Sequence, residues 1–209
     1  MKISSRSLSV AAAFAGLVAA AAPAVAQTTV AGTTLGCFGV GCSPTASTAT
    51  YAIGSSGASI TFTGTSFSGT TNPVTNAFTV GNFGTFVLNG LSSSTPNTTF
   101  STPFTLAFAL TSPGSTTATT TFNVAGFVGN ANGQGARDIS YTGGTTTFSA
   151  GGSNGTIAVD GGQIGVQATT ISGRVTASSV VPEPSTYALL ATGFVGLAGA
   201  VRRRRNAQV

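Results

Sequence analysis

The 209-residue sequence contains no histidine, no tryptophan and only three acidic residues. Histidine is the most common general base, and a serine or threonine nucleophile needs such a base to become reactive. Between residues 27 and 180, called the body below, there is no lysine, and Asp138 and Asp160 are the only carboxylates. The body therefore lacks the usual groups for acid–base catalysis, and we expect no enzymatic activity and no cofactor.

A catalytic alternative would be a glycan hydrolase that uses Asp138 and Asp160 as its two carboxylates. The contexts of both residues favour simpler roles. Asp138 follows Arg137 at the start of an apolar run, and Asp160-Gly161 is a typical turn sequence. A calcium site built on Asp160 would have a single carboxylate, which makes a weak site. The non-enzymatic interpretation is the better supported one.

Charge is also scarce away from the chain ends. The formal net charge is +5, but most basic residues lie in the first six or last eight positions. Within the body, Arg137 and Arg174 face an equal number of acidic residues, so the body is close to neutral. Two arginines cannot form a groove for a phosphate backbone, so we expect no nucleic-acid partner.

Only two cysteines are present, Cys37 and Cys42, in the sequence Cys-Phe-Gly-Val-Gly-Cys. In an oxidising compartment this pair can close a small disulfide loop. A metal site would need further ligands, and the sequence offers no histidine and no other cysteine, so we expect no metal. A redox role is a third reading, but it lacks the usual two-residue spacing.

What the body does contain is phenylalanine, threonine and glycine in short alternating runs separated by turn sequences. The first such run is Ile60–Phe62, and later ones include 104–110 and 145–148. This pattern predicts an all-β fold, with a Thr/Ser/Gly-rich β-sandwich domain over residues 27–180. We expect a single sandwich of jelly-roll or immunoglobulin-like type, whose strands run from about residue 43 to residue 180. The sequence also predicts several turns, one of them at Asn154-Gly155, and a strand over residues 166–175. The expected core residues are Phe62, Phe78, Phe86, Leu106, Phe108, Phe122, Val124 and Phe148.

Residues 1–26 have the three parts of a secretory signal peptide. A positive start with Lys2 and Arg6 precedes an apolar stretch over 8–22, and Ala24-Val25-Ala26 is a small-x-small cleavage site. The apolar stretch is short for a membrane anchor. We expect cleavage after Ala26, so that the mature chain begins at Gln27.

Residues 181–209 form a second three-part segment. The stretch Val181-Pro182-Glu183-Pro184-Ser185-Thr186 is polar and extended, because each proline fixes its own φ and disfavours helix before it. An uncharged apolar run over 187–201 follows and predicts a transmembrane helix of marginal length. Four arginines then form a membrane stop retained on the cytoplasmic side: Arg202, Arg203, Arg204 and Arg205.

This order of motif, apolar helix and arginine cluster resembles the PEP-CTERM sorting signal over the last thirty or so residues. The resemblance implies recognition at Pro182-Glu183-Pro184 by an exosortase, an integral-membrane cysteine protease-transpeptidase. It also implies export through the inner membrane of a Gram-negative bacterium, of a kind that often makes extracellular polysaccharide. An ordinary single-pass anchor is the alternative. Two stretches of the body, 78–90 and 102–108, resemble the choice-of-anchor domains that precede such tails, and that resemblance implies an adhesin-like domain.

Two functional classes remain for the body. The first is a structural or adhesive component of the cell surface or matrix, associated with exopolysaccharide and biofilm, with many neutral hydroxyl groups on its surface. The second is a carbohydrate-binding module for a specific glycan. Such modules stack sugar rings on exposed aromatic side chains, and in the absence of tryptophan only Tyr51 and Tyr141 could serve without disturbing the phenylalanine core. We favour the first class.

Overall fold

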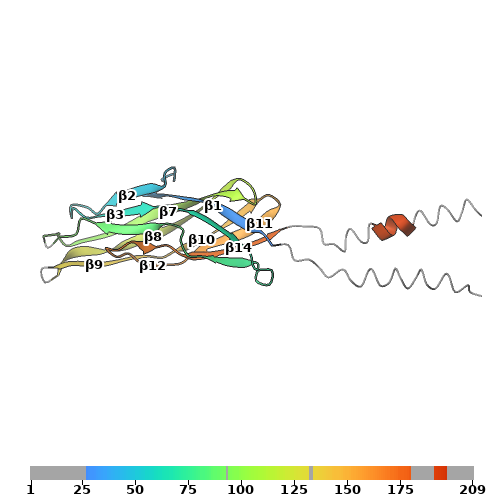
Figure 1. Cartoon of the computed structure of the whole chain (residues 1–209). Coiled ribbons are helices and arrows are strands. Elements are labelled where there is room, and N and C mark those ends of the chain that lie inside the picture. Colours follow the sequence, from blue (N-terminus) through green and yellow to red (C-terminus); the bar gives the residue numbers. More distant parts are fainter. Residues whose placement is uncertain (1–26, 93, 132–133, 180–190, 197–209) are drawn as a thin grey trace, which may run out of the picture. The chain divides into compact units, whose positions relative to one another are not determined.

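The computed structural model describes residues 27–92, 94–131, 134–179 and 191–196, and within these ranges the chain is mainly β-strand. Residues Gln27–Val180 form one compact unit, which is the body defined above. Its strands form three sheets (Figure 1). The body is an all-β sandwich, as its alternating sequence predicts.

The largest sheet has six strands in the order β12-β9-β8-β7-β1-β4. Its two longest members, β7 and β8, form a hairpin that pairs in regular register from Thr98↔Val128 to Leu110↔Thr116. The strand bounds are β1 Thr29–Phe38, β4 Ser66–Thr70, β7 Thr98–Ser112, β8 Thr116–Ala131, β9 Gln134–Tyr141 and β12 Gly162–Gln163.

Two four-stranded sheets, β10-β11-β14-β5 and β13-β6-β3-β2, complete the fold. They adjoin where β5 leads into β6 and β13 leads into β14, because the Phe83 N–H donates to the Ile171 carbonyl (2.7 Å) and the Ile171 N–H donates to the Gly84 carbonyl (2.8 Å). The bounds are β2 Thr48–Ala52, β3 Ser59–Thr63, β5 Ala77–Val80, β6 Thr85–Asn89, β10 Gly144–Ala150, β11 Ser153–Val159, β13 Thr169–Thr170 and β14 Gly173–Ser179.

Phenylalanine rings fill the core between the sheets. Phe104 on β7 contacts Phe62 on β3 and Phe86 on β6, with ring centroids 5.0 and 5.1 Å apart. Seven of the eight expected core residues are buried, and the exception is Phe78. Phe78 is half-buried at the core margin and lies so close to Gly69 that any side chain there would collide with its ring.

Three local expectations were wrong. The sandwich does not begin near residue 43, because β1 (29–38) lies between β7 and β4 in the large sheet. Asn154-Gly155 is not a turn but part of β11, and the hairpin turns instead at Gly151-Gly152, where both φ values are positive (56° and 72°). The run 166–175 is interrupted, since only Thr169–Thr170 and the residues from Gly173 onward are strand.

Candidate functional site

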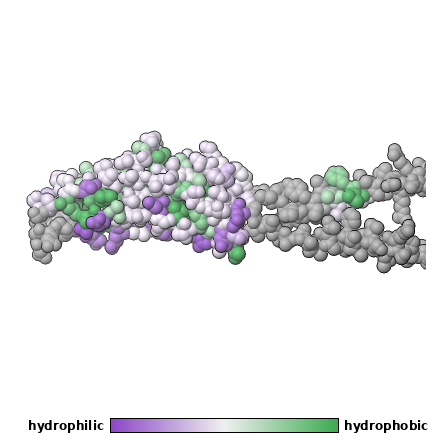
Figure 2. Space-filling view, in the orientation of Figure 1, coloured by the Kyte–Doolittle hydropathy of each residue, from purple (hydrophilic) through white to green (hydrophobic). Residues whose placement is uncertain are grey.

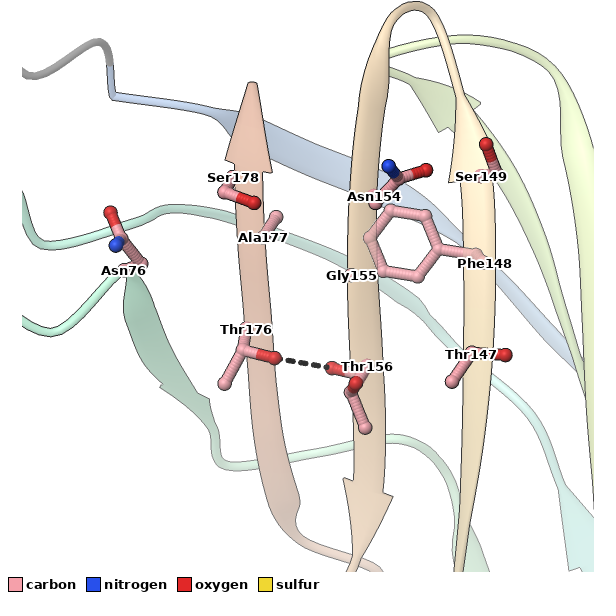
Figure 3. A pocket seen from close by; sticks show the side chains of 10 residues that line it. All are labelled: Asn76, Thr147, Phe148, Ser149, Asn154, Gly155, Thr156, Thr176, Ala177 and Ser178. Atoms are coloured by element: carbon pink, nitrogen blue, oxygen red, sulfur yellow. Dashed lines mark hydrogen bonds between the residues drawn. The ribbon is translucent and has the colours of Figure 1, made fainter. Parts of the chain in front are cut away.

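A groove of about 600 Å³ lies on the solvent-facing side of the β10-β11-β14 strands (Figure 3). Alternate residues of a strand point to opposite faces. On β10, β11 and β14 the side chains of Phe148, Ile157 and Val175 are buried, so the residues directly before and after each of them face outward. Strand register then aligns these outward residues in two rows across three strands. The rows are Thr147–Thr156–Thr176 and Ser149–Asn154–Ser178.

Asn76 extends the groove beyond β14 and is held there by its backbone. Its N–H donates to the Asn72 carbonyl (2.8 Å), and its carbonyl accepts from the Ala177 N–H (2.9 Å). Its φ is 51°, a left-handed value that asparagine tolerates better than most side chains. The Asn72 carboxamide oxygen in turn accepts from the Val74 N–H (2.8 Å). The 72–76 loop therefore fixes Asn76 at one side of the groove.

Phe148 supports the groove from the core side. Its side chain is 6% exposed, and its ring lies across Gly155 (Figure 3). A Cβ on Gly155 would come within 2.4 Å of the Phe148 ring and 2.3 Å of the Thr176 carbonyl oxygen. Glycine is therefore required at the centre of the three strands, and the Phe148 ring fills the space that a side chain would otherwise take.

Most polar side chains in the groove make no hydrogen bond to another protein group. The Thr176 hydroxyl is within 3.5 Å of the Thr156 carbonyl oxygen. Within the described part of the chain, no protein hydrogen bond engages the side chains of Asn76, Ser149, Asn154 or Ser178. All ten lining residues are uncharged. The charged side chain one row along β14 is Arg174, which is exposed.

The two tyrosines considered for sugar stacking lie in different environments. Tyr141 is 5% exposed and contacts Phe86 and Phe122 in the core, so the expectation that it is an exposed platform was wrong. Burial, and to a smaller extent the charge of Asp160, raise the pKa of Tyr141 above its ordinary value near 10. Tyr51 is half-buried, with its ring between Phe38 and Phe100 (centroids 5.7 and 5.8 Å away).

The two carboxylates of the body occupy positions typical of surface structure. Asp138 is exposed on β9, next to the exposed Arg137. Asp160 follows β11 and accepts a hydrogen bond from the Ser172 hydroxyl (2.9 Å). Neither carboxylate lines the groove. Among the described residues, no group of three or more histidine, cysteine, aspartate or glutamate side chains is placed to hold a metal ion.

Cys37 and Cys42 form a disulfide bond in the structure, with a Cα–Cα distance of 6.1 Å. Cys37 pairs with Thr105 of β7, so the bond anchors the 39–41 loop to the large sheet. Val40 at the tip of this loop is 93% exposed. The disulfide lies on a different sheet from the groove strands, and neither cysteine lines the groove.

The expected targeting residues lie largely outside the described ranges. This applies to Ala24 and Ala26 of the cleavage site, to the motif 181–186 and to the arginines 202–205. Gln27, the expected mature N-terminus, is the first described residue, and β1 begins two residues later. Among the residues that the structure describes, no helix is long and apolar enough to cross a bilayer.

Sequence reasoning did not identify the groove. Its signal was the alternation Thr145-Thr146-Thr147-Phe148-Ser149, which marks Thr147 and Ser149 as outward residues. However, the concave shape depends on how three strands align with each other and with the loop before Ala77, about 70 residues earlier in the chain. Local pattern does not contain that information.

Comparison with known proteins gives a match at the C-terminal end of the chain. A family profile described as the PEP-CTERM protein-sorting motif matches residues 180–205. These residues include the Val-Pro-Glu-Pro-Ser-Thr stretch and the four arginines. No curated protein and no solved structure matches the chain.

Proposed function

We propose that this chain, which carries the PEP-CTERM sorting motif of an exported, exosortase-processed protein, is a non-enzymatic component of the cell surface or extracellular matrix. In this proposal the body associates with extracellular polysaccharide. The proposal rests on the combination of a sorting motif with a body that is rich in hydroxyl and carboxamide side chains and has four charged residues in all.

The sorting step follows from the physical properties of the tail. The apolar run 187–201 holds the exported chain in the inner membrane, and Arg202–Arg205 resist transfer because each would cost several kcal/mol in hydrocarbon. A membrane protease then cuts near Pro182-Glu183-Pro184, and the body leaves for the surface or matrix. The motif begins at residue 181, and β14 ends at Ser179. The protease therefore works next to a folded domain.

Mass spectrometry of the extracellular protein tests the sorting step. We expect the collected form to begin at Gln27 and to lack the peptide 187–209. In a Glu183→Ala variant, uncut precursor should accumulate in the membrane fraction. An extracellular form that still contains residues 187–209 would show that the tail is a permanent anchor.

Association with polysaccharide is tested by co-sedimentation of the processed protein with the extracellular polysaccharide of the producing cells. A body with so few charges should bind through neutral groups, so raising the salt concentration should not release it. Complete release by salt would indicate ionic adsorption, and absence of co-sedimentation would contradict the proposal.

A carbohydrate-binding module for one specific glycan is the second candidate, and the groove is the observation that favours it. A glycan array separates the two candidates. Binding to one or two related glycans supports a module, and weak binding to many neutral glycans supports a matrix component.

A further inference from the structure

We infer that the groove across β10, β11 and β14 is the site at which the body binds a neutral polysaccharide chain. The inference deepens the proposed function and rests on it, because it assigns the contact with polysaccharide to named residues. The groove residues that would bind are Asn76, Thr147, Ser149, Asn154, Thr156, Thr176 and Ser178.

The donor and acceptor pattern of these side chains matches that of sugar hydroxyls. A hydroxyl both donates and accepts, and a carboxamide offers an acceptor oxygen and two donor N–H groups. Each therefore can bond a sugar hydroxyl in either direction. Side chains on neighbouring strands recur at about 4.8 Å, which presents a repeating set of groups to a repeating polymer. A polymer that lies across the strands would meet three groups in each row.

The groove side chains keep free a hydrogen-bonding capacity that two cross-strand pairs on the outer face of β7 and β8 use within the protein. On the outer face of β7 and β8, the Thr105 and Thr121 hydroxyls bond each other (3.0 Å), and Ser101 bonds Asn123. The corresponding cross-strand neighbours in the groove, Asn154 and Ser178, make no such side-chain bond to each other. Their groups are available to a ligand without breaking bonds within the protein.

Neutral ligands are favoured over charged ones by what lines the groove. An anionic polymer is normally held by arginine or lysine, and none of the ten lining residues is charged. Arg174 lies one row away on β14, so a single cation is the most that an anionic chain could reach there. Because no lining group ionises, we expect binding to be independent of pH between 5 and 9.

The volume of this open groove is large enough for a few sugar rings. Its volume of about 600 Å³ is within the range of about 300–1,000 Å³ that is usual for small-ligand sites. The Phe148 ring beneath Gly155 and the fixed backbone of Asn76 keep the groove in shape. A ligand would therefore bind without first ordering the protein, which lowers the entropic cost of association.

Affinity electrophoresis of the processed protein tests the site. The gels contain dextran, mannan, galactomannan or the polysaccharide of the producing cells, and alginate serves as the charged comparison. The groove variant is Asn154→Ala with Ser178→Ala. Its matched control is Ser101→Ala with Asn123→Ala, which removes the same two residue types from the face of β7 and β8.

We expect at least one neutral polysaccharide to retard the wild type, and the groove variant to bind it at least about fivefold more weakly, because two hydrogen bonds are lost. The control should bind within about twofold of the wild type. Asn76→Gly is a second, milder variant, since glycine keeps the positive φ and removes only the side chain. It should also weaken binding and has little reason to disturb folding.

The outcomes separate the inference from the proposed function. If both double variants bind as the wild type does, the groove is not the site, although polysaccharide association stands. If the wild type prefers alginate, the assignment of a neutral ligand is wrong. If the wild type binds no polysaccharide, including that of the producing cells, the proposed function fails and the inference with it.

Discussion

The two polar faces of the sandwich have similar residues but use them differently. On the face of β7 and β8, two pairs of polar side chains are hydrogen-bonded across strands, Thr105 with Thr121 and Ser101 with Asn123. On the face of β10, β11 and β14, residues of the same types line a groove, and most of their polar atoms have no protein partner. In the view of Figure 2, much of the body surface has intermediate hydropathy, with hydrophobic and hydrophilic patches between. Composition alone therefore does not tell a self-satisfied polar face from one that can bind.

Hydroxyls that pair with each other and hydroxyls that face water contribute differently to stability and to binding. A face whose hydroxyls pair with each other gains a little stability and offers fewer free groups. A face whose hydroxyls face water gains nothing from them in the free protein, because water satisfies them equally well. Free groups can then be given to a ligand at little loss, which is the physical reason to assign binding to the groove.

Removing the aromatic support beneath each face should have the largest effect. Phe148→Ala and Phe122→Ala each empty a buried ring site and should each lower the free energy of unfolding by about 3–5 kcal/mol. Urea unfolding of the processed protein measures both. Polysaccharide binding should distinguish the two positions, because of these two rings only Phe148 lies under the groove.

Phe148→Leu and Phe122→Leu make that binding measurement possible in proteins that stay folded. We expect Phe148→Leu to weaken retention by neutral polysaccharide and Phe122→Leu to leave it unchanged. Equal loss of binding in both variants would mean that general destabilisation, not the shape of the groove, governs the contact.

Strand positions and core residues were predictable because they follow a local rule. Phe104, Leu106 and Phe108 alternate with small or polar residues, and a strand places such a series on one face. The turn at Asn154-Gly155 was mispredicted because Gly151-Gly152, three residues earlier, offers two positive φ values and competes for the same hairpin. The pairing register of the two strands decides which sequence forms the turn, and that register depends on contacts with residues far away in the sequence.

The burial of Tyr141 shows a second limit of prediction from the sequence. It ends the run Ile139–Tyr141, so its position in a strand was predicted, but its face was not. The outcome depends on Phe86 of a distant strand, whose ring centroid lies 5.5 Å from that of Tyr141. The sorting motif, in contrast, is read directly from the sequence, because it is linear and the family profile matches it there.

The disulfide on the large sheet should have the next largest effect. Replacing Cys37 and Cys42 together by serine should lower the free energy of unfolding by about 2 kcal/mol or less, because the closed loop is short. Chemical denaturation of the oxidised and double-variant proteins measures the difference. Binding to polysaccharide should not change, since the bond lies on the other sheet. Thiols that titrate in the unreduced extracellular protein would show that the bond does not form there.

Alkaline pH should reveal the buried phenol of the large sheet. Folding raises the pKa of Tyr141, so the folded state favours the protonated phenol. Its contribution is therefore fully present below the ordinary value near 10 and is lost as the pH rises through the folded-state pKa. We expect wild-type stability to fall above pH 10 and Tyr141→Phe to fall less steeply. Identical slopes for the two proteins, measured by thermal unfolding from pH 7 to pH 11, would contradict this assignment.

The smallest effect tests the comparison between the faces most directly. A double-mutant cycle on Thr105→Val and Thr121→Val measures the coupling of two hydroxyls that are 3.0 Å apart. The matching cycle on Thr147→Val and Thr156→Val measures two cross-strand neighbours in the groove, which share no side-chain hydrogen bond. Both pairs are solvent-accessible, so the coupling in the first should be no more than about 0.5–1 kcal/mol. The second should be zero within the error of about 0.3 kcal/mol that such cycles allow. Equal coupling on the two faces would mean that the groove hydroxyls pair with each other in solution. In that case they would not be free for a ligand, and the groove would lose the free hydrogen-bonding capacity on which the inference rests.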